Sequence, residues 1–358
     1  MFIFLIQKIF YGILVLFGVT TVIFFLFNIL PGDPARMMLD QREDAKQLKV
    51  IKAKYAFDRP VFEQYLLYLN DISPISIHSK KDGAFSSLNK NKYSYIALFS
   101  NLNYSIVLKK PYLRDSFIRK DTPVLSIIND TFKNTFILAI SSLSIATIIG
   151  LLFGILSALY KNTFVDRFIL FLSVLGMSIP SFFAAIIIAW IFGFLLTSYT
   201  GLSMTGNLFE VDDYGDGVYL KLQNLILPSI TLGIRPLSIV VQFCRNSLIE
   251  VLSMDYIRTA YAKGLHRKSV IFKHAIRNAF NPLITVISGW LASLFAGSVF
   301  VEYVFGWNGI GKEIVDSLNN MDLPVIMGIV LFIALIFVTI NILVDIIYTW
   351  IDPRIKIK

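Results

Sequence analysis

The sequence predicts an all-α polytopic membrane protein with six transmembrane helices and both termini in the cytoplasm. Of its 358 residues, 56% are hydrophobic and only 16% are charged, whereas a soluble domain has about 45–50% apolar and about 25% charged residues. Aromatic residues make up 14% of the chain, and disordered chains are poor in aromatics. Composition therefore excludes a soluble globular domain and a disordered chain. The only cysteine, Cys244, excludes a disulfide scaffold and any multi-cysteine metal site.

Uncharged runs of bilayer length predict where the chain crosses the membrane. A bilayer core about 30 Å thick requires roughly 20 apolar residues of helix. The first predicted span is retained, because its 22 residues exceed the apolar core of a signal peptide and Pro31-Gly32-Asp33-Pro34 follow without a cleavage site. The six predicted spans are residues 9–30, 134–160, the first part of an uncharged run over 168–209, 225–248, 281–301 and 325–344.

The distribution of basic residues predicts the orientation. Cytoplasmic loops of membrane proteins carry an excess of Lys and Arg. The short connections on the side of the termini hold thirteen Lys and Arg, whereas those on the other side hold only Lys221 and Lys312 together with seven Asp and Glu. Both termini are therefore predicted to lie in the cytoplasm. The long segment 31–133 lies outside, because long loops translocate largely regardless of charge.

This organisation predicts three parts: an N-terminal transmembrane helix (1–30), an extracytoplasmic segment (31–133) and a core of five helices (134–358). Within 41–69, apolar residues recur at helical spacing, which predicts two amphipathic helices interrupted at Arg59-Pro60. The region of about 71–120 is rich in Ser, Asn and Lys and shows no clear period, so we interpret it as an inserted region.

The longest inner connection, residues 250–282, has an unusual composition. Small residues precede Gly264, which can adopt a positive φ and turn the chain. A short helix ending at this glycine is the local prediction. The basic residues that follow suit an anionic membrane surface, and the alternative is a loop that only fixes topology.

The sequence resembles the B-type permease subunits of dipeptide and oligopeptide ABC importers. The segment from Asp255 to Leu265 is similar to the EAA-type coupling loop of that family. Arg258 and Thr259 stand where the general pattern has Glu and Ala, a variant typical of peptide permeases. Further matches occur in order along most of the chain: Pro31-Gly32-Asp33-Pro34, Phe57-Asp58-Arg59-Pro60, Leu227-Pro228, Val301-Glu302 with Phe305, Asn308-Gly309 with Gly311, and Val344-Asp345 with Asp352-Pro353-Arg354.

The resemblance implies a fold like that of type I ABC importer permeases and a location in the bacterial cytoplasmic (inner) membrane. It implies as partners a second homologous permease, two ATP-binding subunits, an extracytoplasmic substrate-binding protein, membrane lipid and a peptide substrate. The chain itself would be non-catalytic and hold no cofactor or metal. The coupling residues implied by the match are Asp255, Tyr256, Arg258, Thr259, Ala260, Ala262, Lys263, Gly264 and Leu265. The region 71–120 and the acidic loop 210–216 exceed the family pattern, and their roles stay open.

Arg235 is a candidate residue of the translocation pathway. It lies about ten residues into the fourth predicted span, hence about 15 Å deep. An ionisable group at that depth faces a water-filled path or a partner charge, and a peptide carboxylate would suit it. The alternatives are a structural ion pair with an acid on another subunit and a side chain that reaches the membrane surface.

Helix-breaking residues within the spans suggest hinges. The candidates are Gly176 with Pro180 and Gly233 with Pro236. Gly150 and Gly154 form a small-xxx-small pair, which serves either intramolecular packing or a subunit contact.

Other motifs carry less weight. Residues 306–312 match the start of the phosphate-binding pattern GxxxxGK, but Glu313 replaces the required Ser or Thr and no strand precedes. His266 and His274 are eight residues apart, about 12 Å on one helix, too far for joint metal ligation without a third ligand. Few aromatics accompany the basic residues of the inner loop, which argues against nucleic-acid binding.

Two alternatives to peptide import remain at this point. One is a permease of the same family for nickel chelates or peptide-like antibiotics. The other is an ion-coupled secondary transporter, although Arg235 is the only plausible intramembrane charge and no acidic or His relay accompanies it.

Overall fold

The structure, a computed structural model, describes residues 2–29, 35, 45–80, 86–88, 94–212 and 217–351. Three segments discussed above lie wholly or partly outside the described part: the motif at 31–34, residues 213–216 of the acidic loop, and the motif at 352–354. The chain divides into two compact units. The first contains Met1–Ile9, Thr131–Glu313 and Leu335–Lys358, and the second contains Phe10–Asp130 and Ile314–Ala334.

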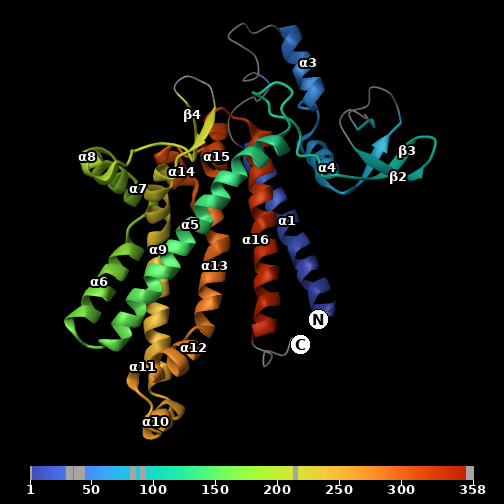
Figure 1. Cartoon of the computed structure of the whole chain (residues 1–358). Helices are drawn as coiled ribbons and strands as arrows, with labels where there is room; N and C mark the ends of the chain where they lie inside the picture. The colour runs from blue at the N-terminus through green and yellow to red at the C-terminus, as the bar shows by residue number, and fades with distance from the viewer. Residues whose placement is uncertain are drawn as a thin grey trace. The chain divides into compact units, whose positions relative to one another are not determined.

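Long apolar helices dominate the chain (Figure 1). Among the described residues, four helices are long and apolar enough to cross a membrane: α1 (Phe2–Ile29), α5 (Val124–Leu159), α9 (Gln223–Leu252) and α16 (Leu323–Ile351). Two further pairs of consecutive helical segments are each bent at a short break, and they bring the number to six if each pair is one span. The polytopic helical architecture is confirmed, and the six predicted spans are reached when each bent pair is counted as one span.

The first bent pair corresponds to the uncharged run over 168–209. It consists of α6 (Phe164–Ser178), followed by α7 (Ser181–Trp190) and the π-helical η1 (Ile191–Leu195), with a bend of 108°. The second pair consists of α11 (Arg267–Ser269), η2 (Val270–Ala275) and α12 (Ile276–Ala279), followed after a bend of 49° by α13 (Asn281–Gly297). Pro180 separates α6 from α7, because proline lacks the N–H that a continuous helix needs.

Glycines allow α5 and α9 of the first unit to approach closely. A Cβ at Gly154 would lie 2.6 Å from the Cβ of Cys244, and one at Gly150 would lie 2.9 Å from the Cβ of Val240. Any larger residue at either position would push the helices apart. The Gly150/Gly154 pair therefore packs α5 against α9 within the chain, and Cys244 is buried in that contact with 3% exposure.

A second core of the first unit surrounds Trp307, which is completely buried. Its indole Nε1 donates to the carbonyl oxygen of Asn134 over 3.1 Å. Short elements complete this unit: α8 (Thr197–Thr200), β4 (Phe209–Val211), β5 (Val218–Leu220), α10 (Asp255–Ala262) and α14 (Val299–Phe305). Strands β4 and β5 form an antiparallel pair. Helix α15 (Ile310–Asn319) begins in the first unit and ends in the second.

The second unit contains the two predicted amphipathic helices, α3 (Ala45–Tyr55) and α4 (Val61–Ile72), with the break between them. It also contains a three-stranded antiparallel sheet in the order β1-β3-β2, from β1 (Ile75–Ser79), β2 (Tyr95–Ser100) and β3 (Tyr104–Lys109). The chain is therefore mostly helical, as predicted, and two small sheets outside the membrane helices add to the predicted architecture. Alternation of apolar and polar residues in β1 and β3 explains these strands, because such a period of two suits a strand.

Candidate functional site

Helix α10 matches the predicted coupling segment, and Gly264 ends it as expected. Gly264 has φ +77°. Its N–H donates to the carbonyl oxygen of Tyr261 over 2.9 Å, and the N–H of Leu265 donates to that of Ala260 over 3.3 Å. These two bonds form a Schellman motif, in which a left-handed residue satisfies the last carbonyl groups of the helix. These bonds and the positive φ of Gly264 fix the direction in which the chain leaves α10.

One face of α10 packs on the rest of the first unit. Ile257 and Ala260 are buried in a cluster with residues of α5, α9, η2 and α12, among them Leu248 and Val251 of α9. Ile257 is 1% exposed. Asn278 of α12 also donates to the hydroxyl of Tyr256 over 2.9 Å. This packing makes α10 a firm projection at the end of α9.

The other face of α10 is open to solvent. Eight of the nine predicted coupling residues are exposed, and the ninth, Ala260, lies in the buried cluster instead. The side chain of Asp255 is 95% exposed and that of Arg258 is 76% exposed. They approach each other to 3.5 Å, an exposed pair that contributes little to stability. The exposed face therefore presents polar, charged and tyrosine side chains that a protein partner can contact.

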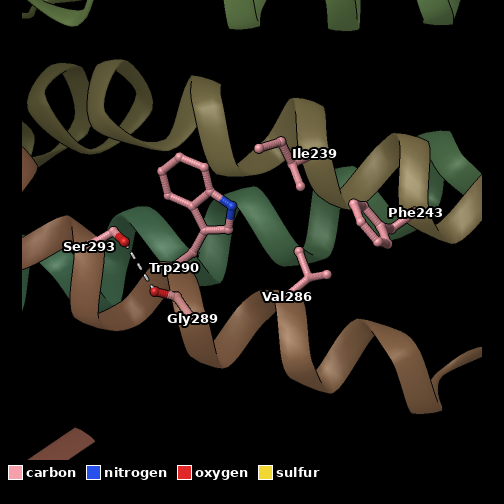
Figure 2. Close-up of a pocket in the computed structure, with 6 residues that line it drawn as sticks. All are labelled: Ile239, Phe243, Val286, Gly289, Trp290 and Ser293. Atoms are coloured by element: carbon pink, nitrogen blue, oxygen red, sulfur yellow. Dashed lines mark hydrogen bonds between the residues drawn. The ribbon is translucent and has the colours of Figure 1, made fainter. Parts of the chain in front are cut away.

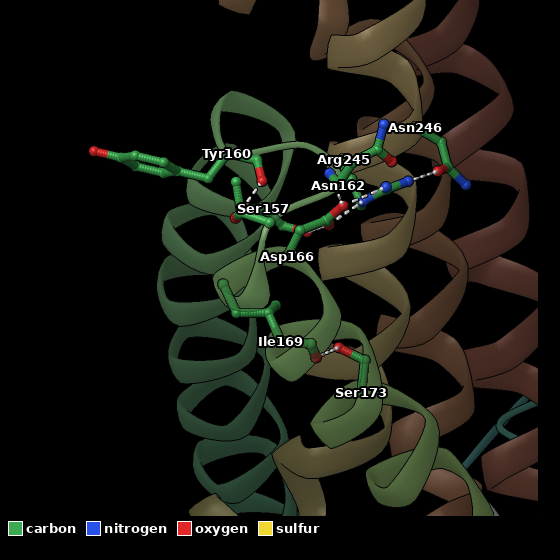
Figure 3. A network of polar contacts seen from close by, with 9 residues as sticks. Ser157, Tyr160, Asn162, Asp166, Ile169, Ser173, Arg245 and Asn246 are labelled. Atoms are coloured by element: carbon green, nitrogen blue, oxygen red, sulfur yellow. Dashed lines mark hydrogen bonds and ion pairs between the residues drawn. The ribbon is translucent and has the colours of Figure 1, made fainter.

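An ion pair fixes the helices above this projection (Figure 3). The guanidinium of Arg245 in α9 donates to both carboxylate oxygens of Asp166 in α6, over 2.7 and 2.8 Å. Asp166 also accepts from the hydroxyl of Ser157 in α5 and from the N–H of Asn162. Its side chain is 3% exposed. In the sequence, Arg245 is one of the thirteen basic residues of the inner connections, and its partner Asp166 lies in a neighbouring inner connection.

Arg235 lies in a small pocket where four helices, α6, α7, α9 and α13, meet. The pocket has a volume of about 60 Å³ and is lined by residues from both sides of the α6–α7 break, from α9 and from α13, including Gly176, Trp290 and Ser293. Arg235 is exposed. It has no hydrogen-bond or ion-pair partner within the part of the chain that the structure describes.

A larger, mostly apolar pocket continues along α9 and α13 (Figure 2). Its volume is about 390 Å³, and its lining is Ile239, Phe243, Val286, Gly289, Trp290 and Ser293. Trp290 and Ser293 line both pockets. The hydroxyl of Ser293 donates to the carbonyl oxygen of Gly289 over 3.2 Å, so it is satisfied by its own helix. Together the two pockets form an apolar surface with one guanidinium group.

The predicted hinge residues are placed differently from one another. Helix α6 ends at Ser178, two residues before Pro180, so the bend lies next to the predicted hinge residue Pro180. A Cβ at Gly176 would lie 2.6 Å from the hydroxyl oxygen of Ser238, which shows that Gly176 also allows α6 to approach α9. Gly233 and Pro236, in contrast, lie inside the unbroken helix α9.

The glycine-rich segment 306–312 surrounds a buried carboxylate of the chain itself. Glu302 is fully buried, and it accepts from the hydroxyl of Thr135 over 2.8 Å and from the N–H of Gly311 over 2.6 Å. A Cβ at Gly309 would lie 2.4 Å from Glu302 Oε2. Burial raises the pKa of Glu302 to about 7, against the lowering effect of these hydrogen bonds. The glycines therefore make room for Glu302. Its carboxylate occupies the N-terminus of α15, the place that a phosphate would need.

Comparison with known proteins identifies the family of this chain. The family model "Binding-protein-dependent transport system inner membrane component" matches residues 150–357, and the model of its N-terminal part matches residues 1–87. The chain is 32% identical over 357 residues to the dipeptide transport permease DppB of Alkalihalophilus pseudofirmus, with 96% of each chain covered. It is 31% identical over 353 residues to the oligopeptide transport permease AppB of Bacillus subtilis, with 99% of each covered.

One further relative and one solved structure extend the comparison. The glutathione transport permease GsiC of Pectobacterium atrosepticum is 32% identical over 340 residues, with 95% of this chain and 94% of GsiC covered. The solved inward-facing MetNI methionine ABC transporter has a chain of similar fold, with a TM-score of 0.50, 14% identity, and coverage of 64% of this chain and 98% of that one. The chain therefore belongs to the family of binding-protein-dependent transport system inner membrane components, the non-catalytic multi-pass permease subunits of ABC importers, which work with ATPase subunits and a binding protein.

Proposed function

We propose that this chain forms half of the translocation pathway of an importer for di- or oligopeptides, and that α10 couples the pathway to ATP hydrolysis. The observation that carries the proposal is the form of α10: a capped helix, packed on one face and exposed on the other. A projection of this kind transmits a rigid-body movement of a bound partner to the helices on which it is mounted. The exposed residues Asp255, Arg258 and Lys263 would contact an ATPase subunit.

The complex around this chain would contain a second homologous permease, two ATPase subunits and an extracytoplasmic binding protein. The basic inner connections support an orientation with both termini and α10 in the cytoplasm. Membership in the ABC importer family removes the ion-coupled secondary transporter as an alternative.

Peptides are the substrate class that we propose. The similar permeases are named for dipeptides, oligopeptides and glutathione, all of which have peptide bonds and a carboxylate. Nickel chelates and peptide-like antibiotics are the second candidate class. Arg235 favours any substrate with a carboxylate, since guanidinium groups recognise carboxylates well.

Purification of the tagged chain in mild detergent tests the proposed assembly. We expect mass spectrometry to find a second permease and ATP-binding subunits, and the eluate to hydrolyse ATP in a vanadate-sensitive manner. Recovery of the folded chain alone, without ATPase activity in several detergents, would contradict the proposal. Competition between labelled dipeptides or tripeptides and nickel chelates for uptake by cells then separates the substrate classes.

Reversal of the charge at Arg235 tests its proposed role in the pathway. We expect Arg235→Glu to reduce peptide uptake at least about tenfold, because a loss of only about 1.4 kcal/mol in the interaction with the passing carboxylate changes the affinity by that factor. Arg235→Lys is the matched control, because it keeps the positive charge and should retain much of the uptake. Unchanged uptake by the Glu variant, at normal membrane levels, would remove Arg235 from the pathway.

A further inference from the structure

The three-stranded sheet of the second unit exposes a largely apolar face, on which Ser79 is the polar side chain at one end of β1. Paired residues of neighbouring strands share a face, and Ile75 pairs with Leu108, Ile77 with Ile106, Ile96 with Leu108 and Phe99 with Ile106. Most of these side chains are open to solvent, for example Ile96 at 68% and Phe99 at 62%. We call this surface the apolar sheet face; it consists of Ile75, Ile77, Ile96, Phe99, Tyr104, Ile106 and Leu108.

On β1 and β3, the opposite face of the sheet is mostly polar and is buried. Ser76 and His78 are each 1% exposed, and Lys109 is 5% exposed. The side chains of Ser76 and His78 share a hydrogen bond of 2.9 Å, and Lys109 donates to the carbonyl oxygen of Asp71. A sheet that borders water has the reverse arrangement, with its apolar face on the core and its polar face outward. The apolar sheet face therefore requires an apolar environment.

Helix α4 joins this sheet to a membrane span. Asn70 of α4 makes two hydrogen bonds with the backbone of Ile77, each of 2.9 Å. Tyr65 of α4 contacts α1 in two ways. Its hydroxyl lies 2.6 Å from that of Thr21, and the centre of its ring lies 5.3 Å from that of Phe24.

These contacts place α4 near the end of the span. The apolar window of α1 covers Phe4–Asn28, so Phe24 lies about 6 Å inside its end at 1.5 Å per residue. Tyrosine is enriched at this level, where lipid meets water. Phe62 and Leu66 of α4 are also exposed, at 63% and 49%.

We propose that the apolar sheet face, together with Phe62 and Leu66 of α4, lies on the lipid bilayer and anchors this unit to the membrane surface. The net charge of the region supports lipid as the occupant: residues 71–120 contain nine Lys and Arg against three Asp. Lys109 is buried and Arg114 pairs with Asp71, which leaves seven basic residues against two Asp. Membrane-surface segments combine a buried apolar face with basic residues that attract anionic headgroups. The continuity with α1 through α4 favours the bilayer over a soluble protein partner.

Fluorescent labelling of single cysteines tests this proposal in the complete transporter, reconstituted in vesicles of phosphatidylethanolamine and phosphatidylglycerol. Cys244, the only cysteine, is replaced by Ala, and Phe99→Cys is labelled with nitrobenzoxadiazole. Ala97→Cys is the matched control, because Ala97 is also exposed and lies on the opposite face of the same strand. The unchanged ATPase activity of both variants shows that the complex is intact.

We expect the label at Phe99 to emit at shorter wavelength than the label at Ala97, and to lose intensity when the vesicles contain lipid with a doxyl group near the headgroup. Equal emission and equal quenching at the two positions would overturn the proposal. A label at Phe99 that is insensitive to doxyl lipid but shifts when the extracytoplasmic binding protein is added would overturn it as well, and would identify a protein partner for this face.

Discussion

Replacement of Gly264 by Val is expected to uncouple ATP hydrolysis from the substrate while the complex stays assembled. Gly264 has φ +77°, a conformation in which a Cβ costs about 1–2 kcal/mol and a β-branched residue is a genuine outlier. A Cβ at this position meets no atom within 4 Å, so the cost is backbone strain and not a clash. The strain is relieved if the Schellman hydrogen bonds break and the end of α10 changes direction.

This strain predicts the size of the effect. A cost of 1–2 kcal/mol changes a population by a factor of about 5–30, and substrate-stimulated ATPase activity should fall by at least that factor. The measurement compares ATPase activity of the purified complex with and without loaded binding protein. Gly264→Asn is the matched control, because Asn tolerates the left-handed conformation better and should keep more of the stimulation. Full stimulation in the Val variant would show that the direction of this turn does not matter for coupling.

The second large effect is expected at Asp166. Asp166→Asn removes the charge that Arg245 faces at 2.7 Å and leaves a largely buried guanidinium unpaired. Removal of one partner of a buried pair costs about 3–5 kcal/mol. We expect a clear loss of thermal stability, measured as the temperature at which the detergent-solubilised complex loses its monodisperse elution peak.

Ser157→Ala provides the comparison for that measurement. It removes one hydrogen bond to the same carboxylate and should cost about 1 kcal/mol. The double variant Asp166→Asn/Arg245→Leu removes both charges and should be more stable than Asp166→Asn alone, since no unpaired buried charge remains. An Asn variant as stable as the unchanged complex would contradict the structural role of the pair.

The membrane helices and the short helix α10 were predictable because their signals are local. Hydropathy identifies each long apolar helix, and Gly264 after a run of small residues predicts where α10 ends. The structure adds that the third apolar run is bent by 108°. Pro180 suggested a bend, but composition alone does not give its size.

Interactions between distant residues could not be predicted in this way. The partner of Arg245 is 79 residues away in the chain, and Thr135 is 167 residues from Glu302. The strands of the second unit were missed because each is only five or six residues long. Their apolar residues alternate with Ser and His in a region whose overall composition is that of a polar loop.

Crosslinking from α10 tests the central claim most directly. A photoreactive amino acid is placed at Arg258, whose side chain is 76% exposed, and in a second variant at Arg119, which is exposed in the other unit. In the purified complex we predict that irradiation joins the chain to an ATPase subunit from position 258 and not from position 119. Absence of this product from position 258, in a complex that contains the ATPase and hydrolyses ATP, would contradict the assignment of α10 as the coupling element.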